Sequence, residues 1–281
     1  MDYNRLMDFD IPPVRQEFSE FDCIRYAISI GLGHDQLDPW HLSFVDESKN
    51  LNVMPSFCTV LGHPGFWLAD PRTTVNAKKL VHGEQTITIE KPIPRSGAVI
   101  GKTRIVNIVD KGKDKGALLY LEKLLRDEVS GDLIATEKRT IMLRGDGGYE
   151  GPSGSIPEPP PEPSGEPMKS VTIQTRPEQA LLYRLNGDPN PLHIDPVAAR
   201  AAGFDKPILH GLCTFGIACQ AMVKIFFEAD INRLGTMSAR FSAPVFPGDT
   251  ILLEAWENGT FQAKALEQNK VVLQNGFLTS K

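Results

Sequence analysis

The sequence predicts an α+β protein of two similar halves, each built from a helix and an antiparallel meander of strands. Three observations predict this class: a proline-rich stretch divides the chain, similar motifs recur on either side of it, and strand-like sequence follows each recurrence. Residues 145–167 contain seven prolines and six glycines, a composition typical of an extended linker. We therefore expect a first half over residues 1–144 and a second half over residues 168–281.

Two pairs of motifs indicate that the halves arose by duplication. Residues 54–60 resemble residues 209–215, and residues 90–97 resemble residues 242–248 with one residue's difference in spacing. Strand-like sequence then continues to the end of each half. A repeat of one unit is the economical explanation of this shared order.

The first half should hold a short helix and several strands. The helix begins near Met54 and is interrupted by Gly62-His63-Pro64-Gly65, because proline and glycine stop helix propagation. So short a helix would leave room for something long and apolar. The segments with strand-like sequence are 83–89, 98–109, 116–126 and 133–143.

The second half should hold a long helix and further strands. Apolar residues keep the spacing of one helix face from Ile208 to Ile225, and Pro207 precedes them at a position where the loss of an N–H is tolerated. Among strands on this scale, such an apolar helix should be wrapped by the sheet. The strand-like segments are 250–256, 260–265 and 271–274, with a turn at Asn258-Gly259 between the first two.

Composition excludes several classes of protein. The chain has 281 residues, 41% of them apolar and 23% charged, which is ordinary for a soluble globular protein. A net charge of −5 argues against a general nucleic-acid binder, and no apolar run approaches membrane-spanning length. The first residues lack the apolar core of a signal peptide, so we do not expect export.

Cysteine and histidine spacing gives no sign of a metal site. The four cysteines lie in apolar stretches without C-x-x-C spacing, which indicates buried free thiols. No two of the six histidines have the spacing of a helical metal motif, so we expect no histidine-based metal site.

The segment Gly187-Asp188-Pro189-Asn190-Pro191-Leu192-His193 is built to be rigid. Its two prolines fix two φ angles, and each pushes the preceding residue toward extended conformations. The glycine removes side-chain bulk next to the carboxylate. The segment is suited to hold Asp188 and His193 in fixed geometry around a small polar molecule such as water.

Three motifs in this order resemble those of the MaoC-like, or type 2, (R)-specific enoyl-CoA hydratases. They are Gly187–His193, the stretch Pro207-Ile208-Leu209-His210-Gly211-Leu212-Cys213-Thr214, and residues 240–250. The second of these, Pro207–Thr214, is similar to the hydratase part of peroxisomal multifunctional enzyme type 2. The resemblance covers nearly the whole chain, strongly over residues 180–255 and more diffusely in the first half.

The resemblance implies a double hot dog fold, in which two antiparallel sheets each wrap a central helix and form a pseudo-dimer. It implies a hydro-lyase that adds water reversibly and syn to a trans-2-enoyl-CoA, giving a (3R)-3-hydroxyacyl-CoA in fatty-acid metabolism. Asp188 and His193 would be the catalytic pair, and the degenerate first half would accommodate the acyl chain. Coenzyme A is then part of the substrate, and no separate cofactor is expected. Family members commonly form homodimers, and coupling to a 3-hydroxyacyl-CoA dehydrogenase is implied.

Further residues are candidates for supporting roles. Asn190 would orient the water, and the backbone N–H of Gly211, near the start of the long helix, would polarise the thioester oxygen. We interpret His210 first as packing at the helix entrance. The candidate substrate contacts are His210, Leu212, Lys206 and Arg240. Asp195 fits a helix cap better than a catalyst, because Pro196 follows it and Gly203 ends the segment.

The sequence leaves alternatives open. It does not decide which of Asp188 and His193 is base and which is acid. The rival functions are dehydration of a 3-hydroxyacyl thioester in another pathway, hydration of branched or dicarboxylic substrates, hydrolysis of a thioester, and non-catalytic binding of acyl-CoA. The chain ends Ser280-Lys281, one residue short of the peroxisomal Ser-Lys-Leu signal, and this ending leaves the location open. The resemblance implies peroxisomes for a eukaryotic source, and for a bacterial source we expect the cytoplasm.

Overall fold

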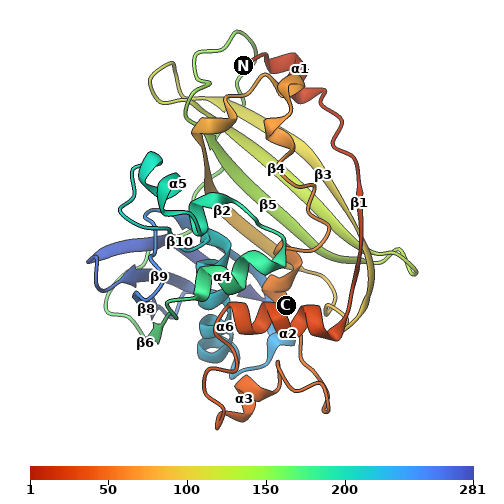
Figure 1. Cartoon of the computed structure of the whole chain (residues 1–281), viewed down its shortest axis with the longest axis vertical. Helices are drawn as coiled ribbons and strands as arrows, with labels where there is room; N and C mark the ends of the chain where they lie inside the picture. Colours follow the sequence, from red (N-terminus) through yellow and green to blue (C-terminus); the bar gives the residue numbers. More distant parts are fainter.

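Ten strands form one antiparallel sheet in the computed structural model, which describes residues 1–281 (Figure 1). The helices lie over one face of this sheet, which curves around them. The strand order is β1-β3-β4-β5-β2-β7-β10-β9-β8-β6. The strands are β1 Val14–Phe18, β2 Leu80–Ile89, β3 Gly97–Asp110, β4 Ala117–Asp127, β5 Leu133–Leu143, β6 Lys169–Gln174, β7 Leu234–Phe241, β8 Thr250–Ala255, β9 Thr260–Ala265 and β10 Lys270–Ser280.

Six α-helices and several single turns of 3-10 helix complete the chain. The α-helices are α1 Tyr3–Met7, α2 Glu20–Ser29, α3 Pro39–Leu42, α4 Gln179–Tyr183, α5 Pro196–Ala201 and α6 Gly211–Phe227. The 3-10 turns are η1 Pro55–Thr59, η2 Trp67–Ala69, η3 Pro71–Thr73, η4 Ala77–Lys79, η5 Arg184–Asn186, η6 Pro191–His193 and η7 Ile231–Arg233. None of the helices combines the length and apolarity that crossing a lipid bilayer requires.

The strand order supports duplication of one unit. The first half contributes β1-β3-β4-β5-β2, and the second half repeats the same order in reverse as β7-β10-β9-β8-β6. We expected two sheets, but they join edge to edge where β2 pairs with β7 from Glu84↔Arg240 to Thr88↔Thr236. Pairing these edges satisfies backbone groups that each half alone would leave exposed.

The helix α6 is the centre of the molecule. It is buried on every side from Cys213 to Val223, as expected for a helix that is apolar all round. It also contacts the first half closely: a Cβ on Gly216 would lie 2.6 Å from Ile30 Cγ2, and Gln220 Nε2 donates a hydrogen bond to the Ile30 carbonyl oxygen at 2.6 Å. Glycine at 216 therefore allows the two halves to pack together.

The equivalent helix of the first half is reduced to the single turn η1. It ends before Gly62, whose φ of +57° no helix continues, and the following loop lies directly on β3. A Cβ on Gly101 would lie 2.1 Å from the Gly62 carbonyl oxygen. The predicted interruption is confirmed. A small hollow beside this loop is lined in part by charged side chains of β4 and β5. Our expectation of room for something long and apolar in the first half stays a prediction.

Three further expectations concern the linker, the cap of α5 and the cysteines. No helix or strand lies between β5 and β6, in agreement with a linker over residues 145–167. Asp195 caps α5 by accepting a hydrogen bond from the Val197 N–H at 2.8 Å. All four cysteines are buried and free, and burial raises the pKa of Cys23 and Cys219 to about 12.

Candidate active site

The segment from residue 184 to 193 is a series of tight turns that expose Asp188 beside the start of α6. The turn η5 ends at Gly187, whose φ of +107° favours glycine. Asp188 follows, and its Oδ1 accepts a hydrogen bond from the Asn190 N–H at 3.2 Å. Asn190 then caps η6 by accepting from the Leu192 N–H at 3.1 Å. Its side chain thus holds the backbone that carries His193.

His193 is buried and held in one tautomer. Its Nδ1 lies 2.8 Å from the carbonyl oxygen of Ile208. A carbonyl oxygen only accepts, so Nδ1 carries the hydrogen, and Nε2 of the neutral ring has a free lone pair. Burial lowers the pKa of His193, while the nearby Asp188 acts in the opposite direction. The imidazole is therefore neutral near pH 7 and can accept a proton at Nε2.

His210 lies inside the same cluster rather than only at the helix entrance. Its ring stacks on His193 with the centroids 3.6 Å apart and the planes at 25°. Its Nε2 donates to the backbone carbonyl oxygen of Asp188 at 3.4 Å, and the ring of Tyr183 lies nearby at a tilt of 46°. Burial and the neighbouring His193 lower the pKa of His210 to about 4. We first interpreted His210 as packing at the helix entrance, but its ring also contacts the candidate catalytic residue His193.

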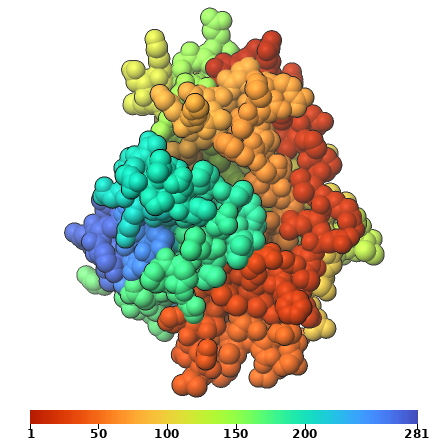
Figure 2. All heavy atoms as spheres, in the orientation of Figure 1, coloured from red at the N-terminus to blue at the C-terminus, as the bar shows by residue number.

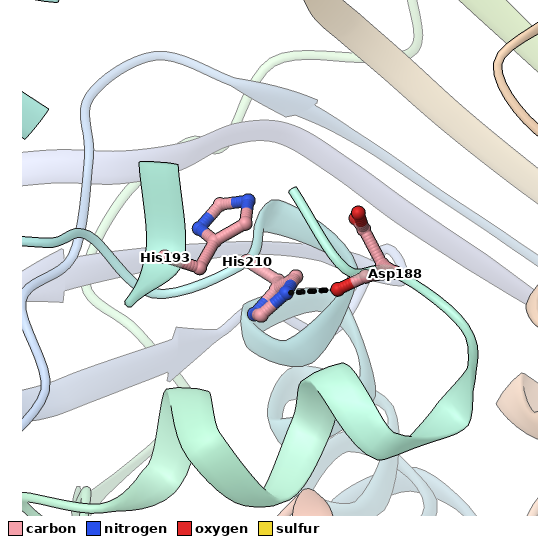
Figure 3. A group of neighbouring side chains, drawn as sticks. All are labelled: Asp188, His193 and His210. Atoms are coloured by element: carbon pink, nitrogen blue, oxygen red, sulfur yellow. Dashed lines mark hydrogen bonds between the residues drawn. The ribbon is translucent and has the colours of Figure 1, made fainter. Parts of the chain in front are cut away.

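Asp188, His193 and His210 together form a compact polar cluster (Figure 3). One ligand atom from each residue lies within 4.8 Å of the others. Spacing along the sequence could not reveal this, because His193 and His210 belong to different motifs. The two rings are nearly parallel, so their in-plane lone pairs do not converge on one point about 2.0 Å from both, as zinc would need. The geometry suits a shared water better than a metal ion.

Gly211 supplies a free backbone donor next to this cluster. It is the first residue of α6, and its N–H has no acceptor within the chain. A Cβ on Gly211 would lie 3.2 Å from Cε1 of Phe241, so a larger residue would disturb this contact. The helix end offers positive potential at the same place. The N–H is therefore available to a developing negative charge.

The three remaining candidate residues lie in different surroundings. Leu212 is half-buried on the first turn of α6, and the Lys206 ammonium lies over the ring of Phe246 at 5.0 Å. Arg240 does not reach the cluster. It alternates with buried Ala239 along β7, so its side chain points to the opposite face of the sheet. We expected Arg240 to contact the substrate through a phosphate of coenzyme A, and that stays a prediction.

Two aromatic residues near the site escaped the sequence analysis. Tyr183 is fully buried, and its ring lies 5.0 Å from that of His210. Phe241 contacts Gly211 and meets the ring of His82 edge-on at 4.9 Å. The residues Tyr183 and Phe241 lie inside or beside motifs that we singled out, but only the fold shows which side chains face the site.

Two family models cover the two halves. The MaoC-like domain matches residues 160–279, and the MFE-2 hydratase 2 N-terminal domain matches residues 16–145. The peroxisomal enoyl-CoA hydratase 2 of Arabidopsis thaliana is 38% identical over 95% of this chain and 92% of its own length.

This chain belongs to the MaoC-like hydratase 2 family. The peroxisomal multifunctional enzyme type 2 of Mus musculus is 35% identical over 95% of this chain, which matches 37% of that longer protein. Among solved structures, a MaoC-like dehydratase from Phytophthora capsici superposes with a TM-score of 0.87 at 30% identity, covering 100% and 99% of the two chains. A Mycobacterium tuberculosis protein described as a double hot dog superposes with a TM-score of 0.58 at 14% identity, which supports the fold assignment alone.

Proposed function

We propose that this chain is a hydro-lyase that hydrates trans-2-enoyl-CoA reversibly to (3R)-3-hydroxyacyl-CoA. The observation that carries the proposal is the neutral, buried His193 facing the carboxylate of Asp188 beside the N-terminus of α6. Relatives that match this chain over nearly its whole length are named enoyl-CoA hydratase 2 and probable enoyl-CoA hydratase 2.

His193 acts first as the base. Its Nδ1–H is committed to the Ile208 carbonyl oxygen, so the neutral ring has no second proton to give before it accepts one. Nε2 takes a proton from water as the water oxygen bonds to Cβ of the enoyl group. The Asp188 carboxylate accepts the other hydrogen of that water and stabilises the imidazolium that forms. Positioned proton transfer of this kind contributes about 10²–10⁴-fold.

As the new C–O bond forms at Cβ, the π electrons of the C=C bond shift toward the carbonyl group and give an enolate. Its negative charge lies on the thioester oxygen, to which the N–H of Gly211 donates a hydrogen bond. The imidazolium then returns its proton from Nε2 to Cα. Both the oxygen and the hydrogen arrive from the side of the substrate that faces His193, so the addition is syn. The ring ends neutral, ready for the next turnover.

The test is hydration of trans-2-enoyl-CoA with chiral analysis of the product. We expect (3R)-3-hydroxyacyl-CoA from substrates of several chain lengths. Predominantly (3S) product, or no turnover of any enoyl-CoA, would reject the proposal. Binding without turnover would leave an acyl-CoA-binding module in its place.

Dehydration is the second candidate, because the reaction is reversible at one site. The similar protein from Phytophthora capsici is described as a MaoC-like dehydratase. The same pair would remove water from a (3R)-3-hydroxyacyl thioester by the reverse steps. The ratio of product to substrate at equilibrium is the same from either direction, so only the physiological supply of substrate separates the two assignments.

Partners and location are part of the same proposal. We propose that a 3-hydroxyacyl-CoA dehydrogenase consumes the product, since a Neurospora crassa relative is named a hydratase-dehydrogenase-epimerase. We propose a homodimer in solution, to be measured by light scattering. The Arabidopsis relative is named peroxisomal, which supports a peroxisomal location for a eukaryotic source, whereas a bacterial source would place the chain in the cytoplasm.

A further inference from the structure

Asp188 depends on neighbouring residues for its position. Its side chain is exposed, and the hydrogen bond from the Asn190 N–H to Oδ1 lies within its own segment. Gly187 precedes it with a φ of +107°, and a Cβ at this glycine would have no atom within 4 Å. From outside the segment, His210 Nε2 reaches the Asp188 carbonyl oxygen at a long 3.4 Å. Asn186, the last residue of η5, is therefore the nearest anchor before the carboxylate.

The side chain of Asn186 joins this segment to the first half of the chain. Its Nδ2 donates to the Ser29 hydroxyl oxygen at 2.8 Å and to the Tyr183 carbonyl oxygen at 3.0 Å. Ser29 is the last residue of α2 and is fully buried. Its hydroxyl in turn donates to the Tyr26 carbonyl oxygen, in the same helix, at 2.7 Å. The hydroxyl thus has both an acceptor and a donor partner, which fixes its orientation.

The backbone of Ser29 makes a second connection. Its carbonyl oxygen lies at the end of α2, where carbonyl groups lack partners within the helix. It accepts from Gln179 Nε2 of α4 at 2.5 Å and from Cys213 Sγ of α6 at 3.3 Å. Cys213 lies two residues after Gly211, whose N–H is the candidate donor to the thioester oxygen. Ser29 is therefore tied both to the segment before the carboxylate and to the helix that carries this donor.

These hydrogen bonds lie where α2 packs against α4 and η5. Figure 1 shows α4 beside α2, and Figure 2 shows the green segment near residue 180 lying against the red segment near residue 25. The buried rings of Tyr26 and Tyr183 pack in the same contact, with their centroids 6.1 Å apart. The two segments belong to different halves, so the second half alone does not hold the catalytic carboxylate in place.

We propose that Ser29 of the first half is a positioning residue for the reaction. Its hydroxyl fixes Asn186, and Asn186 fixes the turn that aims Asp188 at the shared water. The proposal rests on the proposed function, since it concerns the carboxylate of the same site. A shift of about 1 Å in a catalytic group can lower a rate about 10²-fold. Loss of the Ser29 hydroxyl leaves the bond from Asn186 to Tyr183 in place, so we expect a smaller effect than this.

Two variants remove the hydrogen bond from either side. Ser29→Ala keeps the backbone carbonyl, so the bonds from Gln179 and Cys213 remain. We expect kcat for trans-2-enoyl-CoA to fall about tenfold, with KM changed less than kcat. Asn186→Leu should lower kcat at least as much, and the double variant should fall no further than Asn186→Leu, because both changes remove the same bond. Additive losses, or an unchanged kcat in either variant, would overturn the proposal. If one variant fails to fold, the other decides alone.

A second pair of serine and asparagine offers a matched control. Ser43 Oγ accepts from Asn52 Nδ2 at 3.1 Å and donates to the Trp40 carbonyl oxygen at 2.7 Å, at the C-terminal end of α3. Ser43→Ala removes an equivalent bond that leads to no candidate catalytic residue, so this variant should keep the wild-type kcat. An equal fall of kcat in Ser43→Ala would show that any loss of stability lowers the rate, which would overturn the proposal.

The last measurement repeats Ser29→Ala in Asp188→Asn protein. A positioning residue acts through the carboxylate, so without the carboxylate the same change should lower the residual kcat much less than about tenfold. An equal fall in both backgrounds would assign the hydroxyl to the stability of the fold and overturn the proposal. Hydration by the wild-type protein tests the proposed function separately. If the wild-type protein turns over the substrate and the two changes are additive, only the positioning role fails.

Discussion

At the scale of single residues, the hydrogen bond from His193 Nδ1–H to the Ile208 carbonyl oxygen fixes both the orientation and the protonation of the ring. Asp188 differs, because it is exposed and its Oδ1 is held only by the Asn190 N–H. The two residues therefore divide the work: a buried ring that takes the proton, and a carboxylate that orients the water and balances the charge.

The first prediction concerns these two side chains. His193→Gln removes the base, and Asp188→Asn removes the negative charge that stabilises the imidazolium. Each change should lower kcat about 10²–10⁴-fold while the fold stays intact, as measured by hydration of trans-2-enoyl-CoA and by circular dichroism. Asn190→Asp is a useful comparison, because it keeps an acceptor for the Leu192 N–H. Near-normal rates in the His193 or Asp188 variant would remove that residue from the mechanism.

The second prediction concerns stability against pH. Burial depresses the folded-state pKa of His210 to about 4, whereas the unfolded value is about 6.5. Between these values the unfolded chain binds a proton that the folded chain does not. The free energy of unfolding should therefore fall as the pH is lowered from about 6.5 to about 4, by roughly 3 kcal/mol from this residue. Burial lowers the pKa of His193 too, which acts in the same direction.

Urea denaturation over this pH range measures the effect. The comparison is His210→Gln, which cannot take up the proton and should show a flatter dependence of unfolding free energy on pH. Parallel curves for the two proteins would mean that His210 titrates alike in the folded and unfolded chain.

At the scale of elements, the N-terminus of α6 is where the fold meets the chemistry. The N–H of Gly211 is free, and the ring of Phe241 lies where a Cβ would project. We predict that Gly211→Ala displaces this helix end or the ring and lowers kcat at least about tenfold, because small misplacements of an oxyanion donor are costly. KM should change less than kcat. An unchanged kcat would show that another group holds the thioester oxygen.

The sequence predicted the central elements well because local signals determine them. The apolar periodicity from Ile208 gave α6, and β5 and β9 have the predicted bounds. The edge strands β1 and β6 escaped prediction, since they are partly exposed and become strands through their pairing with β3 and β8. The strand β7 also escaped, because glycine, serine and alanine in Leu234–Phe241 weaken its local preference.

The site was predictable only in part for a similar reason. The rigid segment from Gly187 to His193 carries its own signal in prolines and glycine, and the structure brings its two predicted catalytic side chains together. The stacking of His210 on His193 depends on how α6 begins beside η6, which no local pattern records. The position of Arg240 depends on strand alternation in β7, an element that the sequence did not reveal.

At the scale of the whole molecule, the two halves are one structural unit. The ladder between β2 and β7 joins the sheets, and α6 packs into both halves through Gly216 and Gln220. The linker contributes less to holding the two halves together. The Gly154 N–H, near the middle of the linker, donates to the Ile108 carbonyl oxygen, and Trp256 Nε1–H donates to the Gly165 carbonyl oxygen near its end. The residues between them, 156–163, are mostly exposed and form no hydrogen bond.

The last prediction follows because the β2–β7 ladder and α6, rather than the linker, join the two halves. Replacing Pro159-Pro160-Pro161 with a protease recognition sequence and cleaving it should leave both fragments associated and active. The sheet ladder and the buried helix hold the halves together, whereas the cut segment holds neither. Size-exclusion chromatography should show one species of unchanged size, and hydration of trans-2-enoyl-CoA should continue at a similar rate. The second half expressed alone should aggregate or self-associate, because the edge of β7 and one side of α6 would be exposed. Separation of the cleaved fragments under native conditions would show that the linker, rather than the ladder and the helix, holds the active site together.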